Sequence, residues 1–137
     1  MIKRINFLSS IIAFVFLTIS CGNTTAQDGA KTGSSVIAKD LNVTQFEKMM
    51  TEKPGIILDV RTPDEYKQGH IDGSVLIDWY SKDFDQKVAE LDKTKPIYVY
   101  CHVGGRSASA MSKLTKQLGF TEVYNLKGGI VAWRNVH

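Results

Sequence analysis

The hydrophobic positions of the chain fall into short apolar runs, separated by polar segments with turn and helix signals. Five runs have the composition of strands, at residues 36–37, 56–60, 74–78, 97–100 and 122–125. The run at 56–60 has no polar alternation before its terminal residues, which is typical of a strand covered on both faces. Strands that alternate with helices indicate a parallel sheet. The pattern therefore predicts one α/β domain over residues 36–137, with helices on both faces of a central parallel sheet of about five strands.

Helix signals lie between these strands. Asn42 and Gln45 have the residue types and spacing of a capping box at a helix N-terminus. Thr62 and Glu65 repeat that spacing, with Pro63 at the first helical position. The helices predicted in this way cover residues 42–51, 62–69, 84–91 and 107–118, with a last helical turn that ends at residue 133.

The first twenty residues have a pattern of their own. Lys3 and Arg4 precede an almost unbroken apolar run at residues 5–19. That run is shorter than the roughly 20 residues that span a bilayer. Its position at the N-terminus predicts a signal peptide over residues 1–20, and an uncleaved membrane anchor is the alternative.

The residues after the apolar run predict how the signal is processed. Ser20 and Cys21 resemble the end of a bacterial lipoprotein signal, in which Cys21 is lipidated, although Thr18 stands where Leu is usual. Ordinary cleavage after Ala26 is the alternative. In both cases we expect an exported bacterial protein of the cell envelope or periplasm, and lipidation would anchor it to a membrane. Residues 21–35 are rich in Gly, Thr and Ser, which predicts a flexible tether.

The charge balance excludes one class of partner. Without Lys3 and Arg4 the chain has 15 basic and 14 acidic residues, and the lysines are scattered. A nearly neutral chain offers no electrostatic basis for nucleic-acid binding. We expect a monomer that acts on small molecules.

The segment CHVGGRS, residues 101–107, carries the candidate chemistry. Cys101 follows a predicted strand, at the edge where open α/β sheets bind ligands, and a helix begins just beyond it. A helix N-terminus favours negative charge, so we expect the pKa of the Cys101 thiol to lie below its ordinary value. Gly104 and Gly105 allow successive N–H groups to surround an anion. Arg106 would add positive charge at the rim, and Ser107 would cap the helix. A buried, inert cysteine is the alternative.

Four motifs in order resemble the rhodanese family. They lie at residues 58–66, 69–74, 101–107 and 126–133, and the resemblance extends from about residue 36 to the C-terminus. It implies a rhodanese-like domain in which Cys101 takes a sulfane sulfur from an anionic donor, such as thiosulfate or polysulfide, as a persulfide. Cys101 then passes that sulfur to a thiol or cyanide.

The same resemblance implies roles for the loop. Its N–H groups, contributed by His102, Val103, Gly104, Gly105 and Arg106, would bind the persulfide anion. Arg106 would also attract the donor and stabilise developing charge. No metal or organic cofactor is implied, and an extracytoplasmic thiol reductant is one acceptor to consider.

The length of the loop separates two chemistries. Four residues lie between Cys101 and Arg106, whereas cysteine-dependent phosphatases, including relatives of the rhodanese fold, have five. The shorter loop suits a sulfur atom and argues against phosphatase or arsenate-reductase activity. His102 stands where many thiosulfate sulfurtransferases have Arg, which leaves the donor open. A binding or sulfur-carrier module without turnover is therefore the second hypothesis.

Several residues near the loop have more than one interpretation. Asp59 and Arg61 end a neighbouring strand, where they would support the loop by hydrogen bonds or pair with each other. His70 is interpreted as a turn residue with a local partner. Trp79 and Tyr80 would line the mouth of the site or pack in the core.

Overall fold

The computed structural model describes residues 35–137. The predicted signal peptide, Cys21 and all but the last residue of the predicted tether lie outside the described residues. Within residues 35–137, no helix has both the length and the apolar character needed to cross a membrane.

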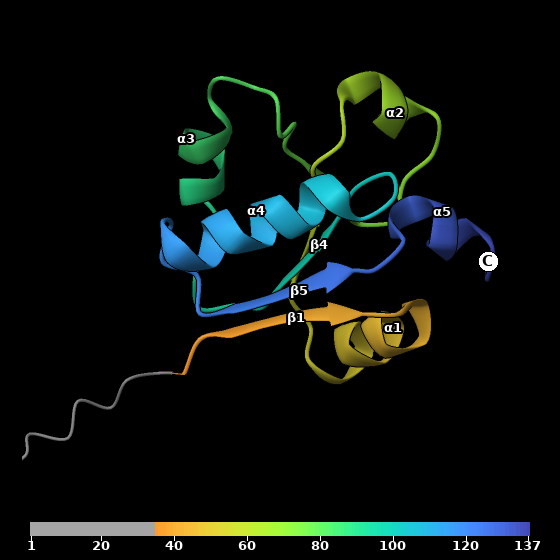
Figure 1. The fold of residues 1–137 in the computed structure, drawn as a ribbon, viewed down its shortest axis with the longest axis horizontal. Coiled ribbons are helices and arrows are strands. Elements are labelled where there is room, and N and C mark those ends of the chain that lie inside the picture. The colour runs from red at the N-terminus through yellow and green to blue at the C-terminus, as the bar shows by residue number, and fades with distance from the viewer. Residues whose placement is uncertain (1–34) are drawn as a thin grey trace, which may run out of the picture. The chain divides into compact units, whose positions relative to one another are not determined.

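Five parallel strands form one sheet, which confirms the predicted fold class (Figure 1). They are β1 (Ile37–Leu41), β2 (Ile56–Asp59), β3 (Val75–Leu76), β4 (Ile97–Tyr100) and β5 (Glu122–Leu126). Their order across the sheet is β1-β5-β4-β2-β3. Every residue of the central strand β4 is buried, as its continuous apolar run predicts.

Within residues 35–137, four helices connect the strands and a fifth follows β5. They are α1 (Val43–Glu52), α2 (Pro63–Lys67), α3 (Phe84–Ala89), α4 (Gly105–Lys116) and α5 (Gly129–Arg134). Both predicted capping boxes form, at Asn42 before α1 and at Thr62 before α2. Each box satisfies N–H groups that the first turn of a helix leaves without an internal partner.

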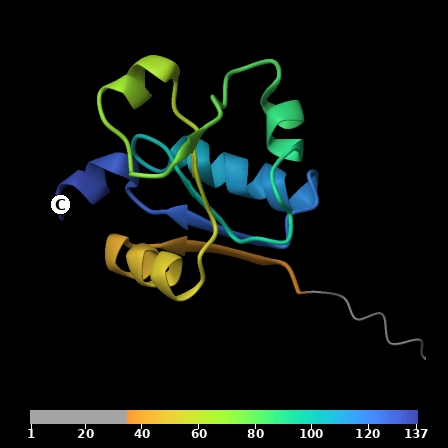
Figure 2. The same ribbon diagram turned by 180° about the vertical axis from the view of Figure 1, so that it is seen from behind.

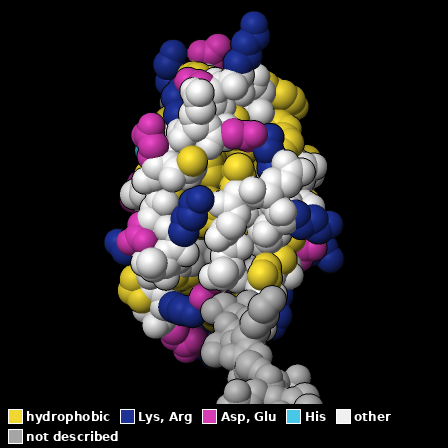
Figure 3. Space-filling model, turned by 90° about the vertical axis from the view of Figure 1, so that its left-hand side faces the viewer, with side chains coloured by type: hydrophobic (Ala, Val, Ile, Leu, Met, Phe, Trp, Pro, Cys, Tyr) yellow, Lys and Arg dark blue, Asp and Glu magenta, His cyan; other side chains and the backbone are white. Residues whose placement is uncertain are grey.

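The sheet separates two apolar layers, because alternate residues of a strand point to opposite faces. Along β4, Ile97 and Val99 pack with buried residues of α3 and α4. Tyr98 and Tyr100 point the other way and pack with residues of α1 and α5. Figures 1 and 2 show α4 and α1 on opposite faces of the sheet accordingly. On the face drawn in Figure 3, basic and acidic side chains are interspersed.

The start of α4 differs from its prediction. The helix begins at Gly105, and its N-cap is Gly104, whose φ of 99° is left-handed. The prediction that Ser107 is the N-cap is therefore wrong. The left-handed turn at Gly104 leads the chain directly from the loop into the helix, so that Ser107 falls within the first helical turn.

β2 and β4 are parallel neighbours, and between them the order in which the chain adds strands changes from one side of the sheet to the other. After β2 it continues to β3 on one side, and after β4 it continues to β5 on the other. Open α/β sheets bind their ligands at the carboxyl ends of strands where the order reverses in this way. Cys101 follows β4 at this edge, and Arg61 follows β2.

The turn between β5 and α5 holds the loop after β4 in place. The N–H of Ile130 donates to the carbonyl of Cys101 at 2.8 Å, and the N–H of Val131 donates to the carbonyl of His102 at 3.2 Å. Gly129 lies against the same two carbonyls with a φ of 58°, and a Cβ there would be 2.5 Å from each oxygen. The loop can come this close because residue 129 is glycine.

We predict that Gly129→Ala destabilises the fold by about 2–4 kcal/mol, since left-handed strain is added to a clash with the loop backbone. Gly73→Ala is the matched control, because Gly73 has a φ of 77° but no atom within 4 Å of an added Cβ. The control is expected to lose only about 1–2 kcal/mol, for the strain alone. Urea unfolding measures both losses, and equal values would show that contact with the loop does not require glycine at position 129.

Candidate active site

Cys101 lies at the bottom of the loop, with 1% of its surface exposed. Its Sγ accepts a hydrogen bond from the N–H of Gly104 at 3.1 Å and one from the hydroxyl of Ser107 at 3.4 Å. Gly104 is the left-handed N-cap of α4, and Ser107 lies in the first turn of that helix. The sulfur therefore lies where the unpaired N–H groups of a helix begin, as the strand–loop–helix pattern predicts.

The Ser107 hydroxyl has two acceptors within reach. It lies 3.1 Å from the carbonyl of Gly104 as well as near Sγ. That carbonyl also accepts the N–H of Ala108 at 3.0 Å. Because the carbonyl has this backbone partner, the single hydroxyl proton can turn to the sulfur without leaving the carbonyl unpaired.

These contacts favour the thiolate. Burial disfavours the charged sulfur and by itself would raise the pKa of the Cys101 thiol. Hydrogen bonds from the Ser107 hydroxyl and from the backbone N–H groups of Ser107, Gly104 and Val103 outweigh burial, so that the pKa lies below its ordinary value. A buried cysteine with these donors has the electrostatics of a nucleophile, unlike the inert cysteine that was the alternative.

The α5 contacts also set the direction of the loop N–H groups. The carbonyls of Cys101 and His102 point at α5. A trans peptide directs its N–H opposite to its carbonyl, so the N–H groups of His102 and Val103 point away from α5. The N–H of Val103 is among the donors that lower the pKa of the Cys101 thiol, so it is available on the side of the sulfur. The side chains of His102 and Val103 are exposed.

Arg106 has a partner that the sequence interpretation did not include. Its Nη1 donates to Oε2 of Glu65 at 2.7 Å, and its Nη2 donates to Oε1 at 2.5 Å. Hydrogen bonds from Arg106, supported by those from Thr62, hold the pKa of Glu65 at about 2 against the effect of burial. The hydrogen bonds with Glu65 likewise raise the pKa of Arg106. The guanidinium is thus a member of a bidentate ion pair rather than a free charge at the rim.

The sequence identified Glu65 as a capping residue and as part of the rhodanese-like motif at residues 58–66, and neither predicts a contact with Arg106. Oε2 of Glu65 does accept the N–H of Thr62 at 3.0 Å, as the capping box requires. The same carboxylate reaches Arg106 because α2 lies beside the start of α4, which local spacing does not show. A carboxylate at the exposed start of a short helix is a weak signal for such a role.

Trp79 and Tyr80 were each predicted to lie either at the mouth of the site or in the core, and they take different positions. Trp79 packs against the core, with its ring centroid 5.0 Å from that of Phe84 in an edge-on arrangement. Tyr80 is 67% exposed, and its ring centroid lies 5.6 Å from the guanidinium carbon of Arg106. Only Tyr80 therefore borders the mouth of the site.

Asp59 and Arg61 pair with each other. Arg61 donates to Oδ2 of Asp59 through Nη2 at 2.7 Å and through Nε at 3.0 Å, and both side chains are buried. Nη2 of Arg61 also donates to the carbonyl of Gly69 at 2.9 Å. The pair thus joins the end of β2 to the turn after α2. His70 in this turn has a local partner, since its Nδ1 lies 3.2 Å from the carbonyl of Tyr66.

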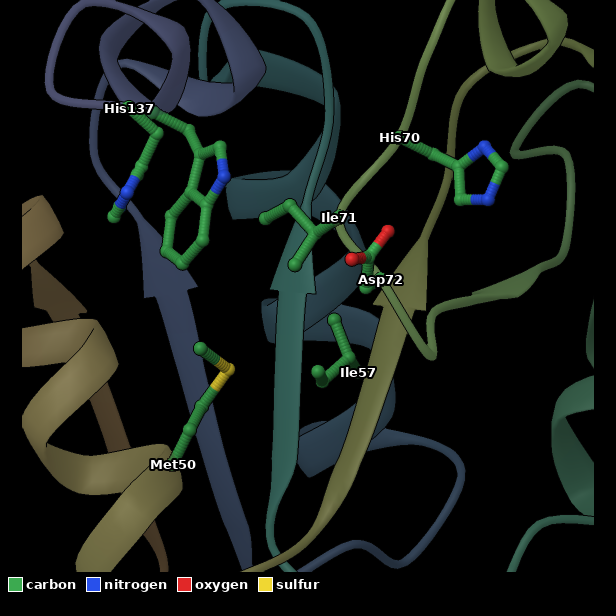
Figure 4. A pocket seen from close by; sticks show the side chains of 7 residues that line it. Met50, Ile57, His70, Ile71, Asp72 and His137 are labelled. Atoms are coloured by element: carbon green, nitrogen blue, oxygen red, sulfur yellow. The ribbon is translucent and has the colours of Figure 1, made fainter.

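A pocket of about 410 Å³ opens on the face of the sheet that α1 and α5 cover (Figure 4). It is lined by Met50, Ile57, His70, Ile71, Asp72, Trp133 and His137. No residue of the Cys101 loop lines it, and we assign the chemistry to the loop because the polarised sulfur lies there. Within residues 35–137, no three His, Cys, Asp or Glu side chains are grouped so as to hold a metal ion.

The fold and the site together define a class: an α/β protein with a hydrogen-bonded cysteine of lowered pKa at the carboxyl edge of a parallel sheet. The arrangement is the one that the rhodanese resemblance implies. The Rhodanese-like domain family matches residues 42–136, and the chain belongs to that family.

Known relatives agree with this assignment. The chain is 38% identical over 91 residues to "Thiosulfate sulfurtransferase GlpE" of Pseudomonas paraeruginosa, covering 66% of this chain and 79% of that one. It is 39% identical over 89 residues to the protein of the same name from Stutzerimonas stutzeri, covering 64% and 78%. A crystal structure of a rhodanese-like domain protein from Staphylococcus aureus is similar, with a TM-score of 0.60 and 28% identity, over 69% of this chain and 90% of that one.

We predict that Ser107→Ala slows alkylation of Cys101 by iodoacetamide about three- to tenfold at neutral pH, because one hydrogen bond to the thiolate is lost. The pKa of the thiol should rise in the variant, so that its rate profile moves to higher pH. Mass spectrometry of the peptide that contains Cys101 measures the rate. Ser109→Ala is the control, since that hydroxyl donates only to the carbonyl of Gly105 on the exposed side of α4. Equal alkylation rates and pH profiles for the unmodified protein, Ser107→Ala and Ser109→Ala would show that Ser107 does not activate the thiol.

Proposed function

We propose that this protein is a rhodanese-type sulfurtransferase that moves a sulfane sulfur from a donor such as thiosulfate or polysulfide to a thiol or cyanide. The observation that carries the proposal is the pair of hydrogen bonds from Gly104 and Ser107 to Sγ of Cys101. They stabilise a thiolate together with the backbone N–H groups of Val103 and Ser107. The names of the relatives support the same reaction.

The first half of the reaction forms a persulfide. The Cys101 thiolate attacks the outer sulfur of thiosulfate, a bond forms between the two sulfurs, and the bond to the sulfonate sulfur breaks. The electron pair of that bond leaves with sulfite. The negative charge of Cys101 then lies on the outer sulfur of the persulfide, where the backbone N–H groups of the loop stabilise it.

The second half returns the enzyme to its thiolate. A nucleophilic acceptor, cyanide or a thiolate, attacks the outer sulfur, and the electron pair of the S–S bond returns to Sγ. The donors that favour the thiolate, Gly104 and Ser107, make Sγ a better leaving group in this step. No metal or organic cofactor takes part in either half of the proposed cycle.

Two features argue against phosphate chemistry. Four residues separate Cys101 from Arg106, which leaves a small loop. Both terminal nitrogens of Arg106 also donate to Glu65, so the end-on fork that could hold a phosphate already has a carboxylate partner.

We predict that incubation with thiosulfate adds the mass of one sulfur atom to the protein. Cys101→Ser should show no gain, whereas Cys21→Ser should gain as the unmodified chain does, because Cys101 alone is the acceptor. Intact-protein mass spectrometry measures the gain. If thiosulfate and polysulfide both leave the mass unchanged, the proposed function is wrong.

Turnover separates the enzyme from a carrier module. An enzyme produces thiocyanate from cyanide and thiosulfate far above the rate of Cys101→Ser. A loaded protein that releases its sulfur to neither cyanide nor thiols would instead support the second hypothesis, a sulfur-carrying or binding module.

We also propose that the enzyme acts outside the bacterial cytoplasm, anchored to a membrane by a lipid on Cys21. The support for this proposal is the signal-like sequence of residues 1–20 and the composition of the segment after it. In that compartment a thiol reductant would be a natural acceptor, since Cys101 has no second cysteine to resolve its persulfide once Cys21 is acylated.

We predict that the protein from bacterial membranes carries an acyl-modified N-terminal Cys21. Mass spectrometry of its N-terminal peptide tests this, and Cys21→Ala should release the protein from the membrane fraction. An unmodified chain that begins after residue 26 would establish ordinary cleavage instead.

A further inference from the structure

Arg106 is a cation near the reactive sulfur, and its charge is matched by a carboxylate that takes two of its five N–H donors. Glu65 accepts from both terminal nitrogens of the guanidinium. The ring of Tyr80 lies near the guanidinium, 5.6 Å from its central carbon. The side chains of Arg106 and Glu65 are only 18% and 27% exposed, so solvent screens their attraction less than it would at the surface. A donor that arrives at the loop therefore meets an ion pair with no net charge.

The position of Glu65 is fixed independently of Arg106. Its Oε2 accepts from the N–H and from the hydroxyl of Thr62, at 3.0 Å each, as part of the cap of α2. The pKa of Glu65 is about 2, with Arg106 as the main cause, so that the carboxylate stays ionised throughout the neutral range. The pair is thus present whenever the enzyme is folded near neutral pH.

With the charge of Arg106 paired, the loop binds anions mainly through backbone N–H groups. They are short-range dipoles, and they fit the single charge of a persulfide sulfur. A second charge, such as the sulfonate of thiosulfate, would need a free cation nearby, and Glu65 cancels most of the field of Arg106. A donor with one negative charge does not have this need.

We propose that Glu65 is a positioning residue that sets donor specificity: by pairing with Arg106 it makes the site favour sulfane-sulfur donors of one negative charge, thiosulfonates and organic persulfides, over dianionic thiosulfate. This inference rests on the proposed sulfur transfer through Cys101. It assigns to Glu65 a role beyond its cap, and it names the class of donor.

Two donors allow the charge to be varied while the chemistry stays the same. With thiosulfate, the thiolate takes the outer sulfur and sulfite leaves with the electron pair of the broken S–S bond. With benzenethiosulfonate, the thiolate takes the equivalent sulfur and benzenesulfinate leaves with that pair. Each reaction yields the same Cys101 persulfide and conserves charge, but the first donor is a dianion and the second is a monoanion.

The experiment measures kcat/KM for both donors in the full-length protein and in Glu65→Gln. The amide can still accept from Thr62, but it leaves the charge of Arg106 uncompensated. We expect the ratio of thiosulfate to benzenethiosulfonate kcat/KM to rise about five- to tenfold, because a free cation attracts the dianion more strongly. The thiosulfate reaction of the variant should also become more sensitive to added salt.

Asp64→Asn is the matched control. Asp64 lies next to Glu65 in α2, is 88% exposed and pairs with Lys67, so its removal changes the net charge equally without touching Arg106. Its donor ratio should stay within about twofold of the unmodified protein, since an exposed charge is well screened. A similar rise in Asp64→Asn would show that net charge, and not the pair with Arg106, sets the ratio.

Each remaining outcome decides the inference. Equal loss of activity toward both donors in Glu65→Gln would reduce Glu65 to a structural role. If that variant does not fold, the unmodified protein still tests the idea, because thiosulfate transfer should be no more salt-sensitive than benzenethiosulfonate transfer; a steeper dependence overturns it. If Glu65→Gln takes up sulfur from both donors with the same ratio of kcat/KM as the unmodified protein, only this inference is refuted. If the unmodified protein takes up sulfur from neither donor, the proposed function is refuted as well.

Discussion

Two backbone hydrogen bonds from the start of α5 determine how the active loop is oriented. Ile130 and Val131 bind the carbonyls of Cys101 and His102, and Gly129 allows the two segments to come into contact. Once these carbonyls are fixed, the N–H groups of His102 and Val103 face away from α5, and that of Val103 is among the donors that lower the pKa of Cys101. Donors that are oriented before the reaction need not reorganise as charge develops, which is the largest advantage that such a site can have. The last helix, remote in sequence from Cys101, is therefore part of what holds the loop around the sulfur.

The loop also shows how a site can bind an anion with little net positive charge. The hydrogen bonds to Sγ come from Gly104 and Ser107, and the one nearby guanidinium is matched by Glu65. Dipoles at close range stabilise a thiolate or a persulfide strongly, but their effect falls off quickly with distance. Such a site acts on the charge at the reacting sulfur and is less sensitive to charge elsewhere on the donor.

The sequence predicted those features that depend on local patterns. The five strands, the caps at Asn42 and Thr62, and the position of Cys101 at the sheet edge follow from apolar runs and from short spacings. The partner of Arg106 could not be found in this way, because Glu65 lies 41 positions away and meets it only through packing of α2 beside α4. The N-cap prediction at Ser107 failed for a different reason. A left-handed glycine can begin a helix without a side-chain cap. Residue type alone does not show whether Gly104 or Ser107 is the N-cap of α4.

The burial of Cys101 gives the persulfide a further consequence in the proposed cycle. The thiolate itself is reached only by donors whose outer sulfur can enter the loop, since just 1% of the residue is exposed. Addition of a second sulfur extends the side chain by about 2 Å, the length of an S–S bond. In the proposed cycle the reactive atom would then lie farther from the buried Sγ. Loading thus requires a small, slender donor, whereas unloading can serve acceptors that are too large to approach Sγ. In the proposed cycle, burial of Sγ would thus allow the protein to select its donor by size and still pass sulfur to bulkier thiols.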